Sequence, residues 1–397
     1  MTDDGDDVGR EEILERIDEL REMIGAEEEL QPMAPDRAIE LWFGQLDDPA
    51  DSTVQSYHYR LDPLEEFFEE QGIDDLNDLT PRDVKEFEAE RRVVVDKQST
   101  LKTQLGTIRQ FLAYCYDLQA VTADVAEALN VPTLSKDERV NTEKLSAKRA
   151  EPILENLDRY RYASAEHVMF LLLWRTCCRI GALRSLDLGD LYLEAGDRER
   201  LRSELEEEGI HPDAVEEVMK DVELPIVWFR HRPAYGTPLK NRRDGERVVN
   251  ITEDTAVVLQ DYIEVNRPDL RDDWGRDPLL TTRSGTGRRS TSNIRNWMYV
   301  LTQPCEFGAE CPHDRDPEEC EAREHGHGSK CPSSRSPHKL RTGSITDHRD
   351  RGWSIEDIAE KANAGERLIR EVYDQPNELL RAGARRENLG VDRRSDS

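Results

Sequence analysis

Two arginines and a histidine have types and positions suited to chemistry on an anionic group. Arg179 follows an apolar segment that includes Leu171-Leu172-Leu173-Trp174. Because burying an unpaired guanidinium costs several kcal/mol, Arg179 either meets a carboxylate or is held for an anionic ligand. His338 and Arg341 lie three residues apart, which places them on one face of a helix. These residues indicate an anion site, with a structural ion pair as the alternative for Arg179 taken alone.

Two stretches of the chain are locally positive. Residues 231–247 contain five bases and two acids, and residues 283–295 contain four arginines and no acid. We predict that they form a groove that binds phosphate groups, with solvated surface as the alternative. The arginines predicted to contact DNA are Arg242, Arg243, Arg283, Arg288 and Arg289.

The net charge argues against a nucleic-acid partner, because the 397 residues carry a formal charge of −30. Of the 55 basic residues only 11 are lysines, and residues 1–30 hold 13 acids against three arginines. An acidic excess with scarce lysine is typical of halophilic proteins that work in molar salt. The Debye length there is about 3 Å, so the net charge does not exclude DNA as a partner.

Four of the seven cysteines fall within 27 residues that are otherwise rich in Gly, Pro and charge. A segment of this kind cannot build an apolar core, and a structural Zn²⁺ would order it. The predicted ligands are Cys305, Cys311, Cys320 and Cys331, with His313, His325 and His327 as possible substitutes. Free thiols and disulfides are the alternatives. Cys115, Cys177 and Cys178 lie in apolar segments and are predicted to be core residues.

The chain has no apolar run of the roughly 18–20 residues that a membrane span requires. The odd cysteine count argues against a disulfide scaffold, and the acidic N-terminus is unlike a secretion signal. We therefore expect a cytoplasmic protein without a membrane partner.

Hydrophobic spacing predicts a mainly α protein with a small β-sheet. Residues 1–33 are an acidic extension whose Ile13 to Ile24 stripe forms either a solvated helix or a self-association helix. A helical domain over 34–132 and a polar linker over 133–144 follow. A mixed α/β domain over 145–376 carries the Cys/His-rich insertion 303–333, and 377–397 are a polar tail.

Local signals place the elements within these domains. Ser52 or Thr53 is predicted to cap a helix that ends at Gly72, Thr80-Pro81 to open the next, and Ser99 or Thr100 to cap a third. Residues 225–229 and 247–251 are β-branched or aromatic runs around a turn-rich segment, which predicts a β-hairpin. The acidic stretch 197–222 is predicted to be helical.

The order of these residues resembles the tyrosine recombinase (phage integrase) family, in a haloarchaeal variant. That family has an Arg after an apolar helix, a Lys on a β-hairpin, His-x-x-Arg and a C-terminal Tyr. Here these are Arg179, Lys240, His338-Lys339-Leu340-Arg341 and Tyr373. The resemblance covers about residues 34–376 and implies a helical core-binding (SAM-like) domain followed by a tyrosine-recombinase catalytic domain.

The resemblance implies a site-specific DNA recombinase that cleaves and rejoins duplex DNA through a 3′-phosphotyrosyl intermediate, without a catalytic cofactor. Tyr373 would be the nucleophile, Arg179 and Arg341 would stabilise the phosphate, and His338 would handle the tyrosine proton. Lys240 would protonate the leaving 5′ oxygen. Plainer interpretations are a packed aromatic for Tyr373, a buried histidine for His338 and turn surface for Lys240. Four protomers on two DNA sites are implied by the resemblance alone.

Two departures from the family pattern keep alternatives open. Ala182 stands where the family carries an acidic residue after the first Arg, and Ala364 stands nine residues before Tyr373, where a phosphate donor is usual. A catalytically impaired DNA-binding regulator is therefore one alternative. A zinc-organised interaction protein is the other.

Overall fold

The computed structural model describes residues 30–46, 49, 51–135, 138, 143–283 and 287–373, and for 51, 52, 372 and 373 the backbone alone. The chain divides into two compact units, Met1–Asn141 and Thr142–Ser397. The stripe predicted from Ile13 to Ile24 and the tail 377–397 lie outside the described residues.

The described part of the first unit is helical around one apolar core. Its elements are α2 (Pro35–Gly44), α3 (Asp51–Gln71), η1 (Leu76–Asp78), α4 (Pro81–Val94), α5 (Gln98–Asp117) and α6 (Ala123–Glu127). Leu61, Leu64, Phe67 and Phe68 form one buried stripe on α3, as a helical period requires. The core joins them to α4 and α5 through Phe87 and other buried residues.

Two of the predicted helix signals hold in the first unit and two do not. The predicted cap at Ser52 or Thr53 is wrong, because α3 already begins at Asp51. Thr80 and Asp83 form a reciprocal capping box with Pro81 in the first turn of α4. Gly72 ends α3 with φ +69°, a conformation that favours glycine. The predicted cap at Ser99 or Thr100 is wrong, because α5 already begins at Gln98 and Lys97 precedes it without a side-chain cap.

The second unit is also mainly helical. Its longer helices are α8 (Ala147–Tyr160), α9 (Ala165–Thr176), α10 (Ile180–Ser185), α11 (Asp197–Glu207), α12 (Pro212–Asp221), α13 (Glu253–Asp261), α14 (Thr291–Leu301), α15 (Pro337–Asp350) and α16 (Ile355–Ala362). Its short turns are η2 (Leu188–Asp190), η3 (Pro233–Tyr235), η4 (Arg242–Gly245), η5 (Tyr262–Asn266), η6 (Pro304–Phe307), η7 (Glu321–Arg323), η8 (Gly328–Lys330), α17 (Glu366–Leu368) and η9 (Ile369–Tyr373).

One antiparallel sheet of three short strands lies in this unit, in the order β1 (Leu191–Tyr192), β2 (Ile226–Phe229) and β3 (Arg247–Asn250). The predicted hairpin is confirmed, because Val227 pairs with Val249 and Phe229 with Arg247. The sequence pattern did not predict β1, which is only two residues long. The acidic stretch is helical as predicted and forms α11 and α12, which carry their own small core.

Helix α9 is the centre of the second unit. Eight of its residues in sequence, from His167 to Trp174, are buried, so neighbouring elements cover it on all sides. Helix α15 packs against it and approaches the start of the unit closely. A Cβ on Gly343 would lie 1.8 Å from the carbonyl oxygen of Leu145, so only glycine allows this approach.

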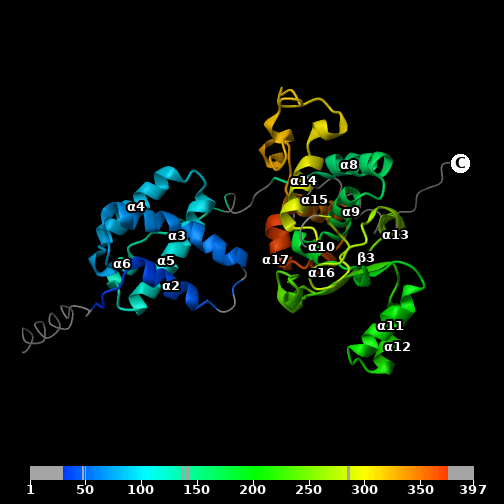
Figure 1. Cartoon of the computed structure of the whole chain (residues 1–397), viewed down its shortest axis with the longest axis horizontal. Helices are drawn as coiled ribbons and strands as arrows, with labels where there is room; N and C mark the ends of the chain where they lie inside the picture. The colour runs from blue at the N-terminus through cyan, green and yellow to red at the C-terminus, as the bar shows by residue number, and fades with distance from the viewer. Residues whose placement is uncertain are drawn as a thin grey trace, which may run out of the picture. The chain divides into compact units, whose positions relative to one another are not determined.

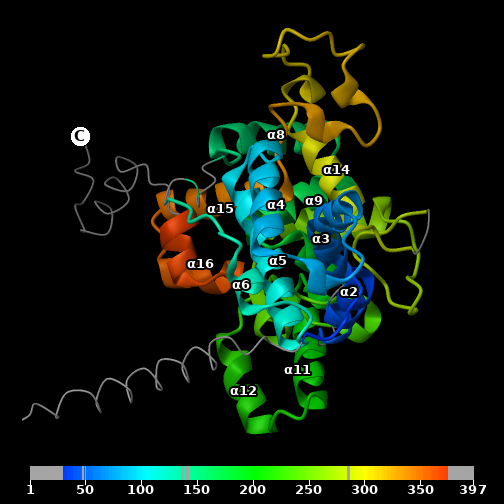
Figure 2. The same cartoon turned by 90° about the vertical axis from the view of Figure 1, so that its left-hand side faces the viewer.

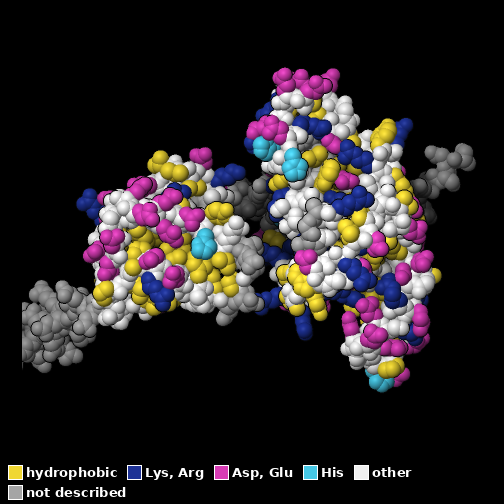
Figure 3. All heavy atoms as spheres, viewed as in Figure 1, with side chains coloured by type: hydrophobic (Ala, Val, Ile, Leu, Met, Phe, Trp, Pro, Cys, Tyr) yellow, Lys and Arg dark blue, Asp and Glu magenta, His cyan; other side chains and the backbone are white. Residues whose placement is uncertain are grey.

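Two segments project from the body of the second unit (Figure 1). Both views place the insertion after α14 at one end and the α11–α12 pair at the other (Figure 2). Acidic side chains gather at these two projections, and lysines and arginines are spread over the body between them (Figure 3). None of the described helices is long and apolar enough to cross a membrane.

Candidate active site

Three arginines bind three successive carbonyl oxygens at the C-terminal end of α16. Arg247 Nε donates to Lys361 O at 2.8 Å, Arg341 Nη1 to Ala362 O at 2.6 Å, and Arg179 Nη1 to Asn363 O at 2.7 Å. The last carbonyls of a helix lack partners within the helix and carry its partial negative charge. The end of α16 therefore gathers positive side chains from three other elements.

Each of these arginines is placed by a different element. Arg179 occupies the N-cap position of α10, directly after the buried helix α9. Arg341 lies on α15 with 1% of its surface exposed, and its Nη1 also donates to Cys177 O at 2.5 Å. Arg247 begins β3, and its guanidinium lies 4.4 Å from the centre of the Phe229 ring.

A small apolar cluster fixes α16 in this position. Ile355, Ile358 and Ala362 pack with Ile345 of α15 and Ile369 of η9. Because all five side chains are buried, the carbonyls at the end of α16 are held on a rigid support.

Burial and the neighbouring positive charges lower the pKa values of two basic groups in the site, Arg247 and His338. Burial, together with the charges of Arg341 and Arg179, lowers the pKa of Arg247 to about 10. Desolvation and then the charges of Arg341, Lys339 and Arg179 lower the pKa of His338. The His338 imidazole is therefore neutral at pH 7 and able to accept a proton, and the charged arginines around it favour an anion.

The structure brings His338 into the group of arginines. It is exposed in the first turn of α15, one turn before Arg341. The backbone of Tyr373 ends η9, which packs against both α15 and α16. The side chain of Tyr373 lies outside the described part of the chain.

Lys240 is exposed in the connection between β2 and β3. Within the described residues it forms no hydrogen bond or ion pair, so its predicted role stays a prediction. The next residue, Asn241, reaches the site, because its Nδ2 donates to Asn363 Oδ1 at 2.6 Å.

Four of the five arginines predicted to bind DNA are accessible. Arg242, Arg243 and Arg283 are exposed, and Arg289 is half-buried with Nε donating to Thr281 O at 2.9 Å. The prediction for Arg288 is wrong, because Arg288 is only 2% exposed and its guanidinium pairs with carboxylates inside the second unit.

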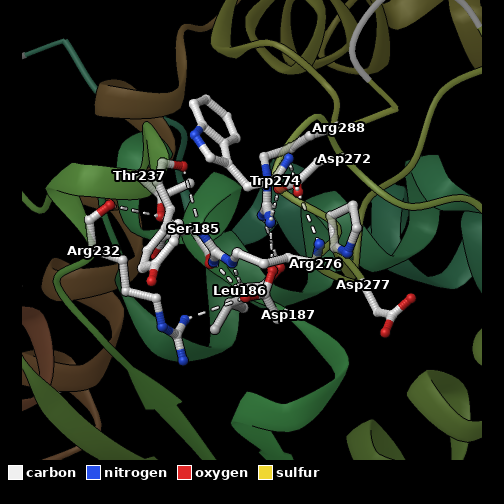
Figure 4. Close-up of polar contacts among 12 residues, drawn as sticks. Ser185, Leu186, Asp187, Arg232, Thr237, Asp272, Trp274, Arg276, Asp277 and Arg288 are labelled. Carbon is white, nitrogen blue, oxygen red and sulfur yellow. Dashed lines mark hydrogen bonds and ion pairs between the residues drawn. The ribbon is translucent and has the colours of Figure 1, made fainter.

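Arg288 belongs to a buried ion network around Asp187 (Figure 4). It pairs with Asp187 and, at 2.8 Å, with Asp272, while Arg276 Nε donates to Asp187 Oδ2 at 2.7 Å. Arg276 Nη1 also donates to Thr237 Oγ1 at 2.9 Å. The network thus ties the connection between β2 and β3 to the chain just after α10, which carries Arg179 at its start.

The predicted zinc site gains no support. Among the residues that the structure describes, which include the whole insertion, no group of three His, Cys, Asp or Glu side chains could hold a metal ion. The four predicted ligands Cys305, Cys311, Cys320 and Cys331 are free thiols. Of the substitute ligands, His313 bonds Ser333 Oγ at 2.8 Å, and His327 Nδ1 lies 3.0 Å from Glu324 Oε2.

Polar contacts connect the insertion to the rest of the second unit. Arg149 Nη2 donates to Thr302 O at 2.7 Å and to Ser333 O at 2.8 Å, which joins its two ends to α8. Arg161 pairs with Glu306 at 2.6 Å, and Gln303 Nε2 donates to Ala322 O at 3.0 Å. The other three cysteines, Cys115, Cys177 and Cys178, are fully buried as predicted.

Sequence reasoning missed two residues of the site. The sequence places Arg247 in the basic stretch 231–247 and in the predicted strand 247–251. An arginine at the start of a strand of apolar residues is a signal for a buried positive charge. No pattern in the sequence indicates a role for Asn363. It ends α16 with φ +49° and ψ +63°, a left-handed conformation that asparagine tolerates at helix ends.

Comparison with known proteins agrees with this architecture. Residues 46–119 match the phage integrase N-terminal SAM-like domain. The tyrosine recombinase XerC of Actinobacillus succinogenes is 23% identical over 143 residues, which are 36% of this chain and 48% of that protein. The resemblance to the tyrosine recombinase family is confirmed. The alignment nevertheless spans only about half the length of that relative.

Two solved structures of tyrosine recombinases share the fold. The Tn1549 transposon integrase in complex with transposon right end DNA has a TM-score of 0.56 at 13% identity, covering 90% of this chain and 99% of that one. A lambda integrase dimer bound to a COC′ core site has a TM-score of 0.52 at 9% identity, covering 91% and 79%. The predicted fold class, a helical SAM-like domain and a mixed catalytic domain of the tyrosine recombinase type, is confirmed.

Proposed function

We propose that this protein is a site-specific DNA recombinase that cleaves and rejoins duplex DNA through a 3′-phosphotyrosyl intermediate. The observation that carries the proposal is the convergence of Arg179, Arg341 and Arg247 at the end of α16. His338 lies one turn from Arg341 on α15, and the segment that ends in Tyr373 packs on α15 and α16. A phosphodiester is the anion that this set of residue types fits.

In the proposed reaction the phenolic oxygen of Tyr373 attacks the scissile phosphorus, and the bond from phosphorus to the 5′ oxygen breaks. His338 takes the phenolic proton, and Lys240 gives a proton to the leaving 5′ oxygen. Arg179 and Arg341 stabilise the extra negative charge on the non-bridging oxygens. One phosphoester replaces another, so the step needs neither a nucleotide cofactor nor a metal ion.

We infer that the first helical domain spans about 34–132 and the catalytic domain about 145–376, joined by the linker 133–144. Double-stranded DNA is the proposed partner, contacted by Arg242, Arg243, Arg283 and Arg289. Assembly of four protomers on two sites is a proposal taken from the family. The acidic composition favours work in high salt.

The test of the reaction is the substitution Tyr373→Phe. The unaltered protein is expected to form a covalent, SDS-resistant adduct with a nicked suicide DNA substrate in high salt, and Tyr373→Phe is expected to form none. Tyr160→Phe is the matched control, because Tyr160 is 68% exposed on α8 and is expected to keep wild-type activity. An adduct formed by Tyr373→Phe would show that another residue is the nucleophile.

A DNA-binding regulator without strand cleavage is the second candidate. Ala182 is buried and provides no carboxylate beside Arg179, and Ala364 provides no side-chain donor at its position. Sequence-specific binding of duplex DNA, without any nicking of the suicide substrate by the unaltered protein, would select this function.

A further inference from the structure

Asn363 occupies a position where the backbone itself restricts the residue type. It follows the last residue of α16 with φ +49° and ψ +63°. Glycine takes this left-handed conformation without steric cost, and asparagine is one of the few other residues that adopt it. Asn363 therefore combines a left-handed backbone with a polar side chain at the end of α16.

The side chain of Asn363 connects two parts of the proposed site. Its Oδ1 accepts from Arg179 Nη1 at 3.3 Å and from Asn241 Nδ2 at 2.6 Å. Its Nδ2 donates to the carbonyl oxygen of Asp244 at 2.6 Å. The amide oxygen thus accepts hydrogen bonds from both Arg179 and the β2–β3 connection. The amide nitrogen donates a hydrogen bond to the same connection.

Lys240 lies within the segment that Asn363 holds. It directly precedes Asn241, and the segment continues through η4 to Asp244. Lys240 itself is exposed and forms no hydrogen bond or ion pair among the described residues, so nothing at its own side chain fixes its position. The bonds of Asn241 and Asp244 to Asn363 anchor the segment to the end of α16, beside Arg247, which bonds Gly245 O and Lys361 O.

We propose that Asn363 is a positioning residue that joins the connection carrying Lys240 to the guanidinium of Arg179. The inference rests on the proposed recombinase function for its chemical consequence. Arg179 would hold the phosphate while Lys240 approaches the leaving oxygen, so their relative placement decides whether proton transfer accompanies cleavage. Asn363 also supplies a polar side chain next to Ala364, where the usual donor is missing.

The substitution Asn363→Gly separates the side chain from the backbone, because glycine keeps the left-handed conformation. Hydrogen exchange at the amides of Arg242 and Glu246 reports on the segment, since these amides donate to Leu239 O and Arg243 O. We expect exchange there to accelerate about tenfold in Asn363→Gly, because two hydrogen bonds to the segment are lost. Unchanged exchange would overturn the proposal.

The second measurement is the single-turnover rate of covalent adduct formation at saturating DNA. We expect Asn363→Gly to lower this rate by about 10²-fold, with the Kd for DNA changed less than about twofold. A substrate with sulfur in place of the bridging 5′ oxygen leaves as a thiolate and needs no proton. It is therefore expected to restore the rate of Asn363→Gly to that of the unaltered protein on the same substrate.

The matched control is Asn250→Ala on β3. Asn250 is exposed and its Nδ2 donates to Glu223 O at 2.9 Å, away from the site. It should change neither exchange at Arg242 nor the adduct rate. A wild-type rate for Asn363→Gly, or a defect that sulfur does not relieve, would contradict the proposal. If the unaltered protein forms no adduct, the recombinase function fails, and the exchange measurement still decides whether Asn363 holds the segment.

Discussion

Arg247 and Arg341 bind neighbouring carbonyl oxygens at the end of one helix. Arg247 Nε donates to Lys361 O at 2.8 Å and Arg341 Nη1 to Ala362 O at 2.6 Å. The two guanidinium groups carry like charges and repel each other. Burial, together with this repulsion, lowers the pKa of Arg247. Helix α16 offsets the repulsion with the negative end of its dipole. A phosphate group in the site would supply the same compensation with a full charge.

The substitution Arg179→Lys tests the need for a planar guanidinium. Lysine keeps the charge but loses the paired donors, so we expect the rate of adduct formation to fall by about 10²–10³-fold. Single-turnover assays on the suicide substrate measure this rate. Arg175→Lys, on α9 four residues earlier, is the control and should retain activity. A wild-type rate in Arg179→Lys would remove Arg179 from the proposed mechanism.

His348 makes the stability of the second unit depend on pH. Burial, followed by the charge of Lys361, lowers the pKa of His348 to about 4, while its Nδ1 lies 2.8 Å from Ser344 O and donates to it. The unfolded chain therefore takes up the proton first. Stability contributed by neutral His348 is complete above about pH 6.5 and is lost as the pH falls toward 4, by up to about 3 kcal/mol.

The measurement is urea unfolding of the full chain between pH 7 and pH 4.5. Asn in place of His348 keeps a donor for Ser344 O but does not titrate, so His348→Asn should lose less stability over this range than the unaltered protein. His211→Asn, at an exposed histidine, should follow the unaltered protein. Parallel pH profiles for His348→Asn and the unaltered protein would contradict the assignment.

Arg288 is expected to act on stability rather than on DNA binding. Its guanidinium pairs with Asp187 and Asp272, and both carboxylates are largely buried. Arg288→Met removes the ion-pair partner of Asp272 and one of the partners of Asp187, which keeps Arg276. It should destabilise the protein by about 3–5 kcal/mol, measured by urea unfolding. Arg283→Gln is the contrast, since Arg283 is exposed, and it should weaken DNA binding with stability unchanged. The opposite pattern would place Arg288 at the DNA.

The arginines show where reasoning from the sequence was sufficient and where it was not. The helices and the hairpin could be predicted from local periodicity and caps. Arg179, His338 and Arg341 could be identified in order because the residues next to each of them form a recognisable motif. Arg288 and Arg283 lie in the same basic stretch, and only the fold shows that one meets Asp187. Ion pairs between residues about a hundred positions apart leave no periodic pattern.

The cysteine-rich insertion is a second case in which contacts between residues distant in sequence could not be predicted. The composition correctly indicated a segment unable to build its own core, and a metal was one physical solution. The structure shows contacts that the sequence could not indicate, because Arg149 and Arg161 come from α8 and the turn after it, over a hundred residues earlier in the chain. Asn363 was hidden for a related reason, because its partners Arg179 and Asn241 are distant in sequence.

The salt dependence of DNA binding tests the two exposed arginines of η4, Arg242 and Arg243. Each phosphate contact releases counterions, so the slope of log K against log salt falls in magnitude by about 0.9 for each contact removed. The double variant Arg242→Gln/Arg243→Gln should therefore show a slope smaller by about 1.8. Fluorescence anisotropy with labelled duplex DNA over a salt series measures it. Arg202→Gln on α11, where Arg202 pairs with Glu216, should leave the slope unchanged. An unaltered slope in the double variant would show that η4 faces away from the phosphates, because loss of charge alone, without contact, does not change the number of ions released.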